Sequence, residues 1–70
     1  MGREGVIHRV NPYLLHGEQY YEIVYSYADE PDTLRQARVA HTNIYASPQE
    51  GDDVIVDAIL SVITEIRKKE

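Results

Sequence analysis

The segment of residues 47–70, SPQEGDDVIVDAILSVITEIRKKE, constrains the fold of this chain more than any other. It is rich in aliphatic residues and contains no glycine, proline or asparagine after Gly51. A strand is about 3–10 residues long, so a longer run without a turn residue is typical of one helix. We therefore expect a helix over residues 48–68.

Both ends of this segment favour the same interpretation. Ser47, Pro48 and Glu50 fit a helix start, because Ser caps the first amides, Pro is tolerated in the first turn and Glu reaches back to the cap. Acidic residues near the start and basic residues near the end would oppose the helix dipole with the correct sign. These residues are Glu50, Asp52, Asp53 and Asp57 at the start, and Arg67, Lys68 and Lys69 at the end.

The same segment also permits a β interpretation. All residues at the even positions from Val54 to Val62 are apolar, and β-branched residues are frequent. Gly51-Asp52 is also a common entry to a strand. The alternative fold is thus a small five-stranded SH3-like β-barrel in which residues 54–69 form two strands. We favour the helix because the sequence offers no evident hairpin turn between Asp53 and Lys69.

Upstream of this segment the pattern predicts strands. They cover residues 5–10, with a possible continuation over 13–16, then 19–27 and 35–45, and Gly17 supplies a tight turn after His16. Short connections make consecutive strands pair antiparallel. We expect a single α+β domain over residues 1–70, with a three-stranded antiparallel β-meander followed by one C-terminal amphipathic helix packed on the sheet.

The predicted helix carries more apolar surface than a three-stranded sheet covers. Its apolar arc spans about 240°, against about 100° for a helix with one buried face. The uncovered flank holds Val56, Leu60 and Ile63. A second copy of the chain, forming a homodimer, is the cover we expect; the alternative is the N-terminal arm over residues 13–15.

All six aromatic residues are tyrosines, and Tyr21, Tyr25 and Tyr27 share one face of the predicted strand 19–27. Tyrosine suits half-buried sheet faces and protein contacts, because it joins an apolar ring to a hydroxyl. Such a row also resembles a stacking platform for single-stranded nucleic acid, but Glu18 and Glu22 flank it where basic residues would be needed. We therefore place these tyrosines with Val56, Leu60 and Ile63 in a predicted protein interface.

Charge and composition narrow the class of protein. The 70 residues include 7 basic and 12 acidic side chains, and the net charge of −5 disfavours nucleic acids and anionic membranes as partners. The chain has no cysteine, which excludes disulfides and thiolate zinc sites. We find no membrane span and no secretory signal, and expect a cytoplasmic protein.

No motif in the chain predicts catalysis. His8, His16 and His41 lack the short spacing of metal ligands, the four glycines form no phosphate loop, and no serine lies in a GxSxG motif. We expect no catalytic residue, no metal and no cofactor. The sequence favours a small non-enzymatic protein-interaction or regulatory module that associates with itself through the C-terminal helix; the alternative is a nucleic-acid-associated accessory domain that uses the tyrosine-bearing sheet.

Overall fold

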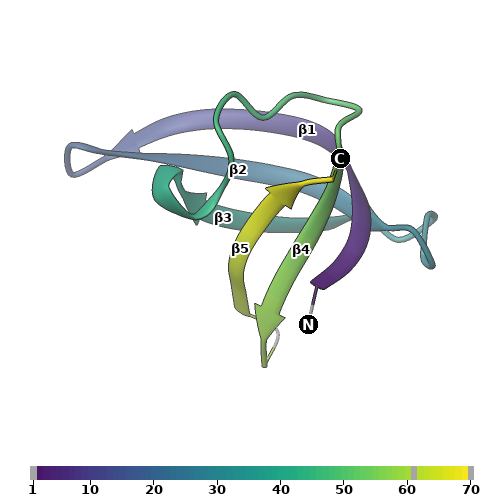
Figure 1. Ribbon diagram of the computed structural model, residues 1–70. Coiled ribbons are helices and arrows are strands. Elements are labelled where there is room, and N and C mark those ends of the chain that lie inside the picture. The colour runs from purple at the N-terminus through teal and green to yellow at the C-terminus, as the bar shows by residue number, and fades with distance from the viewer. Residues whose placement is uncertain (1, 61, 70) are drawn as a thin grey trace.

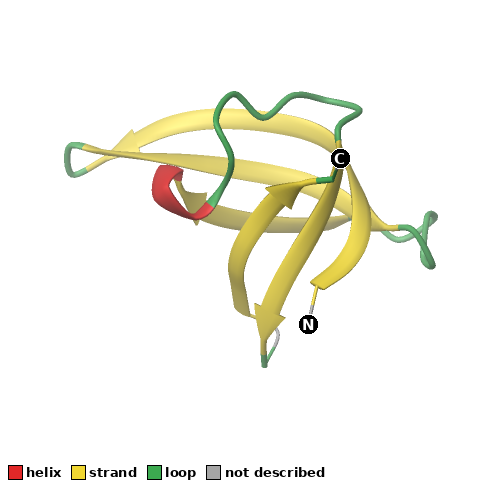
Figure 2. Cartoon of the chain, in the orientation of Figure 1, coloured by secondary structure: helices red, strands yellow, loops and turns green. Residues whose placement is uncertain are grey.

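The chain forms one five-stranded antiparallel sheet in a computed structural model that describes residues 2–60 and 62–69 (Figure 1). Strands account for almost all of the regular structure, joined by one short 3-10 helix (Figure 2). The elements are β1 (Gly2–Leu15), β2 (Glu18–Tyr27), β3 (Arg35–Ala40), η1 (His41–Asn43), β4 (Asp53–Ile59) and β5 (Val62–Lys68). Their order across the sheet is β3-β2-β1-β4-β5, so the two edge strands are β3 and β5.

The central strand β1 bends at a β-bulge. Ile7 is opposite Tyr25 and Arg9 is opposite Val24, so His8 is an extra residue without a partner on β2. Such a bulge bends a strand and increases its twist. The N-terminal part of β1 pairs with β4 over residues 2–6, whereas its pairing with β2 runs from residue 5 to residue 15. As a result, β4 and β5 cross the long ribbon of β1, β2 and β3 (Figure 1).

The hydrophobic core lies inside this folded sheet. Side chains alternate between its two faces, as the period of a strand requires. The expected division of β2 into faces is confirmed, because Ile23, Tyr25 and Tyr27 are buried and Tyr21 packs against them. The buried apolar residues are Ile7, Ile23, Tyr25, Tyr27, Val39, Ile44, Val54, Val56 and Ile66.

The loop from η1 to β4 ties the two halves of the sheet together. Ile44 forms an isolated parallel bridge with Ile66 of β5. The Tyr45 hydroxyl donates a 2.6 Å hydrogen bond to the Asp52 carboxylate, and this bond is the main reason why the pKa of Asp52 lies below its usual value. The Gly51 amide donates to the Ile7 carbonyl at 2.8 Å, which extends the pairing of β1 beyond β4.

The predicted helix over residues 48–68 is wrong, and with it the α+β class and the three-stranded meander. Most of the segment forms the hairpin of β4 and β5, two strands as in our alternative interpretation of it. Ile59 is opposite Val62, so the chain reverses between them, and Leu60 adopts a positive φ of 50°. Leucine rarely takes this conformation, so the residue type does not announce the turn. In the described part of the chain, no helix is long and apolar enough to cross a membrane.

The charge order that suggested a helix dipole has a different cause. Arg67 Nε lies 3.1 Å from Asp57 Oδ2 on the neighbouring strand, and Lys69 Nζ lies 2.9 Å from Glu4 Oε1. Asp57 and Arg67 of the segment therefore face each other across strands, whereas Lys69 pairs with Glu4 of β1. Ser47 has a φ of 56° and precedes a loop, so it caps no helix.

The N-terminal half is closer to expectation. The antiparallel sheet is confirmed, as is the turn after β1, where His16 and Gly17 have φ values of 52° and 80°. Several boundaries differ from those we expected, and β1 begins at Gly2 instead of residue 5. β1 continues through Asn11-Pro12 instead of breaking there, and β3 ends at Ala40, before η1, instead of continuing to residue 45.

Gly5 of β1 packs tightly against the backbone of β2, and its substitution tests the bent sheet. A Cβ atom there would lie 2.7 Å from the Ser26 carbonyl oxygen, which belongs to the backbone and cannot move aside. We expect Gly5→Ala to lower the free energy of unfolding by about 1–3 kcal/mol in urea titration, the usual cost of overpacking. Gly17→Asn is the control, because its surroundings are open and Asn tolerates a positive φ. Wild-type stability of Gly5→Ala would contradict this packing.

Candidate functional site

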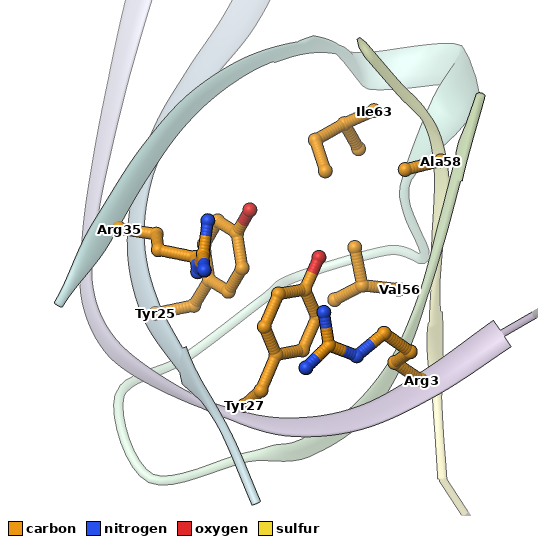
Figure 3. A pocket seen from close by; sticks show the side chains of 7 residues that line it. All are labelled: Arg3, Tyr25, Tyr27, Arg35, Val56, Ala58 and Ile63. Carbon is orange, nitrogen blue, oxygen red and sulfur yellow. The ribbon is translucent and has the colours of Figure 1, made fainter. Parts of the chain in front are cut away.

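The sheet stays partly open along the seam between its edge strands, β3 and β5. The two strands come close to each other, but among the described residues no backbone hydrogen bond joins them. Two connected hollows lie along this seam. The first, which we call the inner pocket, encloses about 220 Å³. It is lined by Arg3, Tyr25, Tyr27, Arg35, Val56, Ala58 and Ile63 (Figure 3).

The second hollow, which we call the outer groove, encloses about 360 Å³ between the residues of β3 and the start of β5. It shares Tyr25, Arg35 and Ile63 with the inner pocket, so the two form one continuous depression. Its full lining is Tyr25, Arg35, Gln36, Ala37, Arg38, Val62 and Ile63.

Two arginines approach the ring of Tyr27 in the inner pocket. The guanidinium carbon of Arg3 lies 3.7 Å from the ring centroid, and that of Arg35 lies 5.2 Å from it. Both distances fall within the range of a cation–π interaction. Tyr25 packs edge-on against Tyr27, with centroids 5.4 Å apart. The tyrosine hydroxyls point into the pocket towards the aliphatic wall formed by Val56, Ala58 and Ile63 (Figure 3).

Both arginines form ion pairs with carboxylates that lie outside the inner pocket. Arg3 lies 3.0 Å from Asp29 and 3.4 Å from Glu30, and Arg35 lies 3.1 Å from Glu30. The hydrogen bond that Arg3 donates to Asp29 is the main reason why the pKa of Arg3 is raised. All four side chains are more than 40% exposed. Exposed pairs of this kind contribute about 0–1 kcal/mol each, so a ligand carboxylate competes with them readily.

Arg38 is the third cation of the seam. It is exposed at the rim of the outer groove. Glu22 is its partner on β2, but within the described residues Arg38 has no ion pair. Its guanidinium donors are therefore available to a ligand.

The seam gathers arginines on an acidic protein, and Asp29 and Glu30 outside the two hollows pair with two of them. Of the 7 basic residues in the chain, Arg3, Arg35 and Arg38 line the two hollows. No acidic residue among those described lines either of them. Guanidinium groups only donate hydrogen bonds, and their planar fork matches a carboxylate. The arrangement suits a ligand with both apolar groups and carboxylates.

The structure brings four of the six predicted interface residues together at the inner pocket, namely Tyr25, Tyr27, Val56 and Ile63. Three of these residues are part of the buried core and not of the surface, since Tyr25, Tyr27 and Val56 are only 4%, 6% and 1% exposed. Tyr21 lies further along β2 and is half-buried. Leu60 lies at the β4–β5 turn, where it is 94% exposed.

The arginines of the seam were missed from the sequence. The position of Arg35 could have been predicted. Alternate residues of a strand share a face, so Arg35 lies on the same face as Ala37 and Val39. Arg38 lies on the opposite alternation and reaches the groove only because β3 is an edge strand. Arg3 precedes the strand predicted over residues 5–10, so no pattern assigned it a face.

One histidine contacts a serine, the residue pair used for nucleophilic catalysis. His8 Nε2 lies 2.7 Å from Ser26 Oγ. Ser26 is 1% exposed, however, and a covered hydroxyl does not reach a substrate. His16 lies in the β1–β2 turn and His41 in η1. Across residues 2–60 and 62–69, no group of three His, Asp or Glu side chains is arranged to hold a metal ion.

Comparison with known proteins gives no relative: no family model, no curated protein and no solved structure matches this chain. The geometry of the seam therefore carries the functional assignment.

Tyr25 of the inner pocket makes the stability of the fold depend on pH in the alkaline range. Burial, and then the neighbouring Tyr27 hydroxyl, raise the pKa of Tyr25 to about 12. A pKa raised on folding stabilises the fold below the ordinary value of about 10, and this contribution is lost as the pH rises towards 12. We expect stability measured by denaturant titration to fall between pH 10 and 12, and to fall less in Tyr25→Phe. An equal fall in both proteins would contradict the burial of the Tyr25 hydroxyl.

Proposed function

We propose that this protein is a non-enzymatic protein-interaction module whose seam binds a partner segment that combines apolar side chains with carboxylates. The observation that carries the proposal is the lining of the seam. Three arginines surround an aromatic and aliphatic floor, with no described carboxylate in the lining.

The apolar floor supports an occupant that brings its own side chains. Ala37 and Ile63 are half-buried, and Val62 is 65% exposed at the start of β5. Covering such groups contributes about 25 cal/mol for each Å² of apolar surface removed from water. A small anion alone would leave this surface wet.

The free edge of β3 supports an occupant in an extended conformation. β3 pairs with β2 on one side only, and residues 35–38 of β3 line the outer groove. An edge strand presents unpaired amide and carbonyl groups, which accept an added strand from a partner. The backbone of the partner would then give affinity, while its side chains give specificity.

The nucleic-acid alternative finds no support in the position of the tyrosines. Tyr25 and Tyr27 face the core, and Tyr13 and Tyr20 stack on each other beside Glu18, which accepts a hydrogen bond from Tyr20. A cytoplasmic location, expected from the sequence, stays part of the proposal and would be tested by cell fractionation.

Fluorescence anisotropy with a labelled nine-residue peptide of alternating Val and Glu tests the proposal. We expect saturable binding that weakens as salt is raised, because ions screen the contacts between arginine and carboxylate. The double substitution Arg35→Gln/Arg38→Gln should weaken binding by at least about tenfold, since hydrogen bonds to charged groups contribute about 1.5–3 kcal/mol each.

Arg9→Gln is the matched control, because Arg9 is an exposed arginine of β1 outside both hollows. A peptide of alternating Val and Lys tests the sign of the charge. Equal binding of both peptides, or unchanged affinity in the double variant, would refute the proposal.

A further inference from the structure

An exposed apolar projection lies next to the seam, at the end of the β4–β5 hairpin. Ile59, Leu60 and Val62, which we call the hairpin tip, are 66%, 94% and 65% exposed. Ile59 and Val62 face each other across the hairpin, and Leu60 lies at its end. Three large aliphatic side chains at the end of one projection form a contiguous surface suited to a partner.

The backbone at Leu60 gives a second reason to assign this tip a role. Its φ of 50° is a left-handed conformation that is unfavourable for leucine. Two-residue hairpin turns favour Asn, Asp or Gly at such positions. At the other hairpin, Gly17 takes the position with the larger positive φ, 80°. Leucine at residue 60 therefore does not stabilise the fold, because its side chain is exposed and its backbone conformation is unfavourable.

The tip and the groove belong to the same region of the molecule. Val62 is part of the hairpin tip and also lines the outer groove, together with Ile63. We infer that the partner segment bound at the seam is the hairpin tip of a second copy of this chain. This inference rests on the proposed function and names its partner. Because Leu60 lies in a left-handed turn, the tip binds through its side chains to the apolar floor and the arginines of the seam and does not add a strand to β3.

Symmetry favours this partner over an unrelated one. In a two-fold dimer each copy offers the same surface, so a tip that enters a groove also receives a tip in its own groove. Because tip and groove adjoin at Val62, one axis passing near β5 satisfies both contacts. The outer groove of about 360 Å³ is ample for Leu60 and part of Ile59, since a cavity of about 150 Å³ holds a benzene ring.

The charges are complementary in the same arrangement. Glu65 lies on β5 behind the tip, has a 55% exposed side chain, and is held only loosely by Arg67 at 4.0 Å. Arg38 lies at the rim of the groove without an ion pair among the described residues. With the tip of one copy in the groove of the other, Glu65 of each copy faces Arg38 of its counterpart. The hairpin thus supplies the combination of apolar groups and carboxylate that the seam suits.

Sedimentation velocity of the wild-type protein from 1 to about 500 μM tests this inference. We expect a dimer that dissociates on dilution. Leu60→Asn should weaken dimerisation by at least tenfold, because it removes the side chain that fills the groove. Its thermal unfolding at low concentration should not fall below that of the wild type, because Asn tolerates a positive φ. Leu14→Asn is the matched control, since Leu14 is a 72% exposed leucine near the other hairpin turn.

Charge-reversal variants test the dimer interface in a second, independent way. Arg38→Glu alone and Glu65→Arg alone should each weaken the dimer, and the double variant should regain affinity. A monomeric wild type, or a dimer unaffected by Leu60→Asn and by both reversals, would overturn the inference. A monomer that still binds the alternating Val and Glu peptide would leave the proposed function standing and refute only the second copy as partner.

Discussion

The bend of β1 at His8 is the constraint on which the rest of this structure depends. A short chain without cysteine must bury its apolar side chains with few residues. A flat sheet of five strands would leave one apolar face in water. Because β1 bends, β4 and β5 fold over β2 and β3, and a single sheet covers its own core. Gly5, just before the bulge, allows the close approach to the Ser26 carbonyl that this bend requires.

The same bend determines where the sheet stays open. Each neighbouring pair of strands in the order β3-β2-β1-β4-β5 is antiparallel, but the edge strands β3 and β5 are not neighbours in the sheet, and Ile66 of β5 bridges instead to Ile44, after β3 has ended. Between β3 and the start of β5, side chains line the inner pocket and the outer groove where a ladder of backbone hydrogen bonds would otherwise join the strands. The packing of Arg3 and Arg35 against Tyr27 covers the inner end of the gap with cations. An unpaired edge, an apolar floor and three arginines are thus consequences of one incomplete closure, and they are the basis of the proposed function.

Sequence reasoning recovers the parts of this fold that depend on local pattern. Alternation placed Ile23, Tyr25 and Tyr27 on one face of β2, and Gly17 marked the first hairpin turn. It failed where tertiary contacts decide the outcome. Leu60 adopts a left-handed turn that its residue type opposes, so the pattern predicts a helix where the chain forms a hairpin. The order of charges predicts a helix dipole, whereas Asp57 pairs with Arg67 across strands. The arginines of the seam come from distant parts of the chain, so only the fold shows that they meet.

The central claim is that the open seam of one copy holds the hairpin tip of another, and intermolecular nuclear Overhauser effects test it most directly. A sample mixed from a ¹³C-labelled and an unlabelled protein reports only contacts between copies in an isotope-filtered experiment. We expect cross-peaks from the methyl groups of Leu60 to Ala37 and Ile63 of the other copy. Association of the protein with cross-peaks at other surfaces only, or with none at Leu60, would contradict it.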